Sequence, residues 1–163
     1  MSQCQSSGCY ANSGRIAFTT NRLNSGAKDK RATSVEISKN AKVGPASVTY
    51  VAQQSCPASC VFLPKCLPKA TVSPEDMARE EALAIDRLTG RFDLRLKGVG
   101  DCSTDGAARI VADAVKRFLA RSATYGRAVA AWTYTHAWKP NKEAVKRESF
   151  GPISVLASCH TLA

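Results

Sequence analysis

Three cysteines lie close together in the segment SCPASCVFLPKC, at Cys56, Cys60 and Cys66. Thiolates are natural ligands of zinc and of iron–sulfur clusters, and the spacing here is C-x3-C-x5-C. Zinc knuckles favour C-x2-C pairs and four ligands, so zinc would need a fourth ligand from Cys4, Cys9, Cys102 or a histidine. A 4Fe–4S cluster held by three cysteines leaves one iron open for a substrate or cofactor. The segment predicts a metal site of one of these kinds, with reduced, unliganded cysteines as the alternative.

The redox setting of these thiols follows from the rest of the chain. The start, MSQCQSSGCYANSG, has no apolar run behind a basic segment, so no signal peptide is predicted. No stretch approaches the ~20 apolar residues of a membrane span. We therefore expect a cytoplasmic, reducing compartment and no membrane partner. The chain has seven cysteines, an odd number, which also argues against a disulfide framework.

Other chemical groups follow the predicted strands. In a parallel α/β sheet, ligands collect at the carboxyl ends of the strands. Three such ends read GVGDC, TYTH and ASCH, and they contain both histidines of the chain. A parallel sheet would place these side chains on one rim: Asp101, Cys102, Tyr134, His136, Cys159 and His160. Nucleophilic catalysis by Cys159 with either histidine is one hypothesis for this rim.

Gly98 and Gly100 permit two interpretations. They let a backbone approach a ligand closely, and the helix predicted to begin near Asp105 offers free N–H groups to an anion. They are also typical of a tight strand-to-helix turn. The G-x-G-x-x-G pattern is incomplete, so the glycines do not indicate a nucleotide site on their own.

The elements that must position these groups are indicated by periodicity and caps. Helices are predicted from Ser73 towards Gly90, and from Thr104 or Asp105 towards Gly126, because each has a polar cap before an apolar face. Alternating and β-branched runs predict strands at 33–37, 46–51, 93–97, 128–134 and 153–157. The first two strands, separated by a Gly-Pro turn, suggest a hairpin or two edge strands.

The amino-terminal part looks different from the rest. Residues 1–32 are rich in Ser, Asn, Gly and Lys and are predicted to be mostly loop, with one short strand at 15–20. We divide the chain into a basic, loop-rich, cysteine-containing segment at 1–70 and an α/β core at 71–163. The predicted fold class is α/β, a small and mostly parallel sheet with flanking helices, like part of a barrel.

Charge suggests a partner. The net charge is +10, and the excess lies at the two ends, because residues 71–125 carry nine basic and nine acidic side chains. A basic surface fits nucleic acid or an acidic host protein, although a general solubilising surface is the alternative. The predicted contacts are Arg15, Arg22, Lys28, Lys30 and Arg31. Such binding would weaken steeply with salt.

Several segments together resemble a phage-encoded family, the cysteine-rich "gene product 88"-type proteins: GCYANSGR, ISKNAKVGP, SCPASC, LRLKGVGD, WTYTHAWK and ISVLASC. In that family GCYA follows the C-P-x-x-C segment directly, whereas here it precedes it, at residues 8–11. The amino-terminal third is thus rearranged, and the family's further cysteine-rich segment after S-V-L-A-S is missing. The resemblance implies phage origin and action in the host cytoplasm.

The family's order of cysteine cluster, helix and Gly-Asp strand end is similar to the front half of a radical S-adenosylmethionine barrel. By that analogy Gly100 and Asp101 would contact the methionine part of S-adenosylmethionine. Two functions follow as expectations. One is a non-catalytic binding or accessory protein with a metal site, interacting with a host defence component. The other is an iron–sulfur enzyme, or its remnant, acting on nucleic acid.

Overall fold

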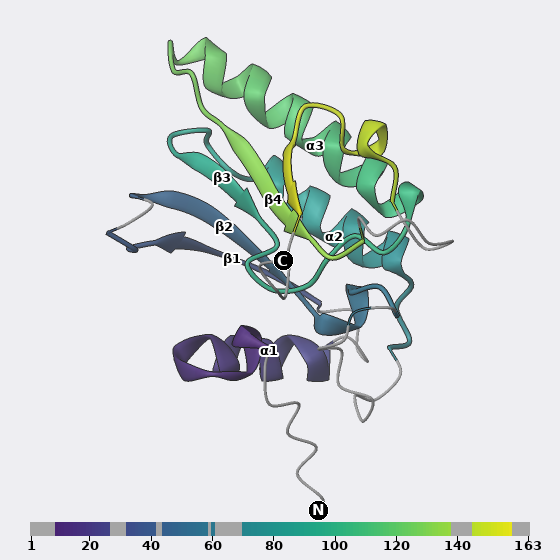
Figure 1. The fold of residues 1–163 in the computed structure, drawn as a ribbon. Helices are drawn as coiled ribbons and strands as arrows, with labels where there is room; N and C mark the ends of the chain where they lie inside the picture. The colour runs from purple at the N-terminus through teal and green to yellow at the C-terminus, as the bar shows by residue number, and fades with distance from the viewer. Residues whose placement is uncertain are drawn as a thin grey trace, which may run out of the picture.

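A computed structural model describes residues 9–26, 32–41, 44–58, 60, 70–137 and 145–157 of the 163-residue chain. Among these residues, five strands stand side by side in chain order: β1 (Thr33–Ser38), β2 (Ala46–Val51), β3 (Asp93–Leu96), β4 (Ala131–Thr135) and β5 (Ser154–Ala157). β1 and β2 pair antiparallel as the predicted hairpin, and each later pair is parallel. The predicted α/β class with a mostly parallel sheet is confirmed (Figure 1).

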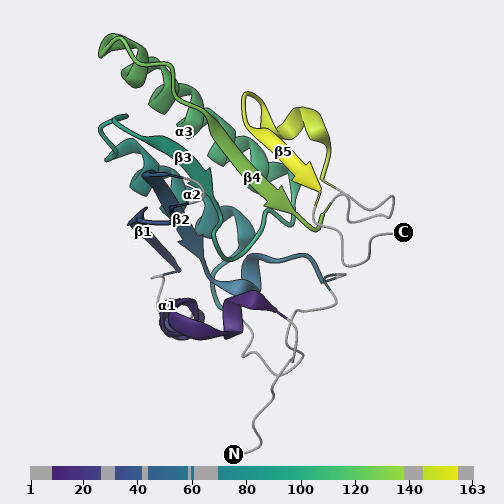
Figure 2. The same ribbon diagram turned by 60° about the vertical axis from the view of Figure 1, so that its left-hand side comes forward.

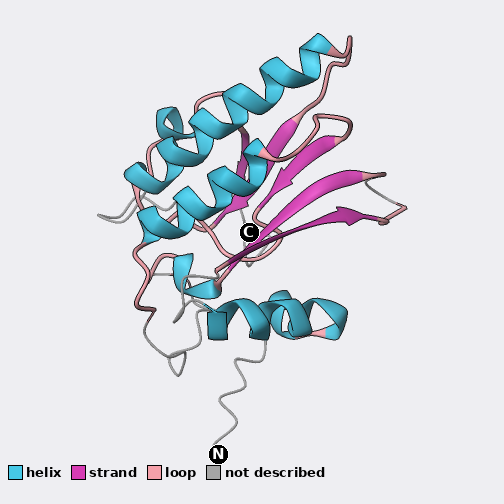
Figure 3. Cartoon of the chain, turned by 180° about the vertical axis from the view of Figure 1, so that it is seen from behind, coloured by secondary structure: helices cyan, strands magenta, loops and turns pink. Residues whose placement is uncertain are grey.

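Two helices cover one face of this sheet. α2 (Pro74–Asp86) connects β2 to β3, and α3 (Asp105–Thr124) connects β3 to β4. They lie side by side on the same face of the sheet, the face nearer the viewer in Figure 3. β4 is joined to β5 through a short 3-10 helix, η3 (Arg147–Phe150). From β2 to β5 the strands are parallel and alternate with crossovers, so the carboxyl ends of these four strands face the same way and meet at one edge of the sheet.

The helix starts lie where the caps predicted them. Ser73 Oγ accepts a hydrogen bond from the Asp76 backbone N–H at 3.1 Å, and Pro74 occupies the first turn. Thr104 Oγ1 accepts from the Ala107 N–H at 3.0 Å, which makes Thr104 the cap of α3. α2 ends at Asp86, earlier than the predicted Gly90.

The main core lies between these helices and the sheet. The apolar faces of α2 and α3 meet the helix-facing side chains of β3 and the loop before β5. The largest buried side chains of this main core are Ile85, Leu94, Leu96, Val111, Val115, Phe118 and Ile153. A smaller cluster under α1 includes Leu23, Val51 and Met77.

The amino-terminal prediction is wrong in part. Residues 14–26, expected as loop with a strand at 15–20, form the helix α1 (Gly14–Gly26), preceded by the 3-10 turn η1 (Tyr10–Asn12). The side of α1 that meets the protein buries Thr20, Leu23 and Asn24. Two of these three residues are polar, so the apolar periodicity that reveals a helix is weak here. α1 lies apart from α2 and α3, near the hairpin (Figure 2).

Candidate functional site

The carboxyl edge of the sheet is tied together by Asp101. Its Oδ1 accepts hydrogen bonds from Thr135 Oγ1 at 2.8 Å and from the Cys102 N–H at 2.7 Å. Its Oδ2 accepts from the His136 N–H at 2.7 Å. The carboxylate is therefore a bridge from the end of β3 to the end of β4, and it is almost completely buried.

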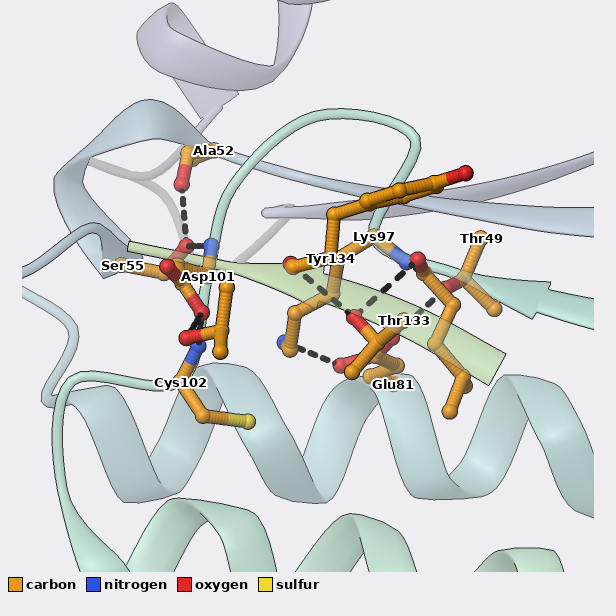
Figure 4. Close-up of polar contacts among 11 residues, drawn as sticks. Thr49, Ala52, Ser55, Glu81, Lys97, Asp101, Cys102, Thr133 and Tyr134 are labelled. Atoms are coloured by element: carbon orange, nitrogen blue, oxygen red, sulfur yellow. Dashed lines mark hydrogen bonds and ion pairs between the residues drawn. The ribbon is translucent and has the colours of Figure 1, made fainter. Parts of the chain in front are cut away.

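Gly100 lets the β3 end approach β2 closely. Its φ is 85°, and a Cβ at this position would lie 2.6 Å from Ser55 Oγ. Ser55 Oγ accepts from the Asp101 N–H at 3.0 Å and donates to the Ala52 carbonyl at 2.7 Å (Figure 4). The two predicted cofactor-binding residues, Gly100 and Asp101, thus join the predicted edge, where both make internal contacts.

Burial raises the pKa of Asp101 to about 6, against the opposing effect of its hydrogen-bond donors and of the Lys97 charge. His136 Nδ1 lies 3.8 Å from Oδ2 of this carboxylate. The edge therefore holds a carboxyl group that changes charge close to neutral pH.

Cys56 and Cys60 lie beside Asp101. η2 (Gln53–Ser55) follows β2, and the Cys56 N–H donates to the Gln53 carbonyl at 2.9 Å. The next turn is closed by the Cys60 N–H, which donates to the Pro57 carbonyl. The two thiols are half-buried and hydrogen-bonded to each other. That bond, then burial, then the negative charges of the neighbouring acidic groups raise the pKa of Cys56 well above its usual value.

A third thiol belongs to the same neighbourhood. Cys9, just before η1, is close enough to influence the Cys56 thiol electrostatically. Its Sγ accepts a hydrogen bond from Gln53 Nε2 at 3.4 Å. Sequence analysis considered Cys9 only as one of several sources of a zinc ligand, because nothing in a linear reading brings it to residues 56–60. The family resemblance gave the one relevant signal, since it associates GCYA with the C-P-x-x-C segment.

These residues fit a metal site only in part. Cys56 and Cys60 are a contacting pair of the donor type that zinc and iron–sulfur clusters require. No three Cys, His, Asp or Glu side chains in the described part of the chain are already spaced to hold a metal ion. Cys66, the third predicted ligand, lies outside the described residues.

Within its described residues, the structure does not bring the other predicted rim residues together. Cys102 is buried on the helix side, where burial raises the pKa of its thiol to about 12 and leaves it unreactive at neutral pH. Tyr134 is half-exposed on the opposite face of the sheet, with the Arg95 guanidinium 5.8 Å from its ring centre. Cys159 and His160 lie outside the described residues.

A buried ion pair lies beneath the β3 end. Lys97 Nζ is 2.5 Å from Glu81 Oε2 of α2, and both side chains are excluded from solvent. Thr49 Oγ1 donates to Glu81 Oε1 at 2.6 Å and accepts from the Lys97 N–H at 2.8 Å. Lys97 has a φ of 53°, the one positive φ of a non-glycine residue in the described segments. This backbone turn directs the ammonium group to the helix side, ending β3 one residue before the prediction.

Most of the predicted polyanion contacts lie outside the residues that the structure describes. Arg22 is exposed on α1. Lys28, Lys30, Arg31 and the side chain of Arg15 lie outside the described residues. None of the helices that the structure describes is long and apolar enough to cross a membrane.

Comparisons of the chain with family models, curated proteins and solved structures found no match.

Proposed function

We propose that this chain is a small metal-binding α/β protein whose thiols hold zinc or an iron–sulfur cluster at the carboxyl edge of the sheet. The observation that carries the proposal is that Cys56 and Cys60 lie in successive hydrogen-bonded turns and bond to each other, with Cys9 bonded to Gln53 and Asp101 to Ser55 just before them. Thiols gathered beside a buried carboxyl group repel one another when they ionise, and a bound cation relieves that repulsion.

The contacts at the edge favour a binding role over catalysis. Both oxygens of Asp101 are used by hydrogen bonds within the protein, and Gly100 packs against Ser55 and Val51. These internal hydrogen bonds occupy most of the acceptor capacity of the Asp101 carboxylate, which leaves it less available to S-adenosylmethionine. The metal would then stabilise the loop after β2 and present it to a partner.

An iron–sulfur enzyme is the second candidate. The cysteine loop follows β2 and the Gly-Asp loop follows β3 at the same edge, in the order that radical S-adenosylmethionine enzymes use. This candidate requires a reduced cluster that cleaves S-adenosylmethionine. Release of 5′-deoxyadenosine from the reduced protein would favour it over the binding role.

The test is metal analysis of anaerobically purified protein. Iron, acid-labile sulfide and zinc are measured in the wild type, in Cys56→Ala/Cys60→Ala, and in the control Cys102→Ala, which removes a buried thiol on the helix side. We expect stoichiometric metal in the wild type and control, and its loss in the double variant. A folded wild type without iron or zinc would contradict the proposal.

A further inference from the structure

We propose that Cys9 is the third thiol ligand of the site, so that Cys9, Cys56 and Cys60 together bind one thiophilic metal centre. This inference depends on the proposed metal-binding function and specifies its ligands. Cys9 takes the place of Cys66, the third cysteine that sequence spacing predicts. It comes from the opposite end of the amino-terminal region.

Gln53 fixes Cys9 relative to the other two thiols. The Gln53 side chain, which is almost fully buried, donates from Nε2 to Cys9 Sγ at 3.4 Å. The Gln53 backbone carbonyl accepts from the Cys56 N–H at 2.9 Å. One buried residue therefore contacts both the segment that carries Cys9 and the turn that carries Cys56 and Cys60.

The direction of the Gln53 amide follows from its partners on α1. The Gln53 backbone N–H, which can only donate, is 2.8 Å from Asn24, so that atom of Asn24 must be the carbonyl oxygen Oδ1. The other end of the Asn24 amide, Nδ2, then donates to Gln53 Oε1 at 2.9 Å. With its oxygen occupied by Asn24, the Gln53 amide must present its N–H group to the Cys9 sulfur.

An N–H group directed at a sulfur stabilises the thiolate, which is the form that binds metal. Hydrogen bonds to the sulfurs are a regular part of metal–thiolate sites. The three thiols are not at ligand spacing in the described residues. Metal binding must draw them together, and the buried Asn24–Gln53 pair holds Cys9 in reach.

Arsenous acid is a probe for this arrangement, because one As(III) can join three thiols. Its three hydroxyl groups leave as water as three As–S bonds form, without a change in oxidation state. Native mass spectrometry of metal-free full-length protein counts the thiol protons lost. We expect three protons lost in the wild type and in Cys66→Ser, and two in Cys9→Ser.

The affinity for As(III) should separate the same variants. Cys9→Ser should bind roughly 100-fold more weakly or worse, since losing even an outer partner of a metal site costs about 10–100-fold. Cys66→Ser should match the wild type. Three-thiol binding that survives in Cys9→Ser and is lost in Cys66→Ser would overturn the inference while leaving the metal-binding function intact. Absence of iron and zinc from the purified protein would count against the function, whatever the arsenic result.

A measurement on the wild type covers the case in which Cys9→Ser does not fold. Iodoacetamide labelling is compared with and without bound As(III), and the labelled peptides are identified by mass. Protection of Cys9, Cys56 and Cys60 together supports the inference. Unchanged labelling of Cys9 in the arsenic-bound protein contradicts it.

Discussion

A buried carboxyl group, Asp101, organises the edge at which the proposed site lies. Its three hydrogen bonds reach the ends of two strands, and they do not fully compensate for its removal from water. Gly100 beside it has a conformation that other residues rarely adopt and has no room for a side chain. Two predictions at this scale follow from these residues.

Asp101 should make stability depend on pH. Its pKa is about 6 in the folded protein, against 3.8 for an ordinary aspartate, so the folded state holds the proton more tightly. The free energy of unfolding should therefore fall as pH rises from about 4 to about 6, and level off above that, by about 3 kcal/mol. Urea denaturation at a series of pH values checks this. In Asp101→Asn the fall should be absent, and identical pH profiles of variant and wild type would refute the assignment.

Gly100→Ala should destabilise the protein by about 3 kcal/mol, because it combines an unfavourable φ with overlap against Ser55 and Val51. Gly126→Ala is the matched control, since Gly126 also has a positive φ but nothing within 4 Å of the added Cβ. The control should lose only about 1 kcal/mol. Equal losses in chemical denaturation would show that the close approach at Gly100 does not matter.

At the scale of elements, the Lys97–Glu81 pair connects the end of β3 to α2. The pair is buried, and Thr49 of β2 bonds to both residues, so three elements meet in one polar network beneath the sheet (Figure 4). The loop that begins at the backbone turn of Lys97 contains Gly100 and Asp101. This network thus positions the edge without taking part in it.

Lys97→Met should cost about 3–5 kcal/mol, because it leaves the Glu81 carboxylate buried without its counter-charge. Lys97→Met/Glu81→Leu should recover much of that loss, since an apolar pair replaces a buried charge pair at little cost. A double-mutant cycle by chemical denaturation measures the coupling. If the double variant loses as much unfolding free energy as the two single variants together, the predicted coupling between Lys97 and Glu81 is wrong.

The helices and the end of β3 also show which structural features can be predicted from the sequence. Helix starts at Ser73 and Thr104 were predictable, because a cap and its partner are three residues apart. α1 was not, since it is anchored by the polar Asn24–Gln53 pair rather than by an apolar stripe. The backbone turn at Lys97 was also unpredictable, because it accompanies an ion pair with Glu81, which lies on another element.

At the scale of the whole molecule, the parallel sheet gathers the ends of separate segments at one edge. Sequence analysis could predict that edge and place Asp101 and His136 on it, since the parallel direction of the strands followed from the alternation of helices and strands. It could not place Cys9, because the approach of α1 and η1 depends on long-range polar contacts. We propose that this convergence creates a thiolate metal site.

X-ray absorption at the edge of the bound metal tests that claim most directly, because it reports which atoms surround the metal. We expect a first shell of sulfur, at about 2.3 Å if the metal is zinc, that is lost together with the metal in Cys56→Ala/Cys60→Ala. A first shell of nitrogen and oxygen alone, in a folded and metal-loaded protein, would contradict it.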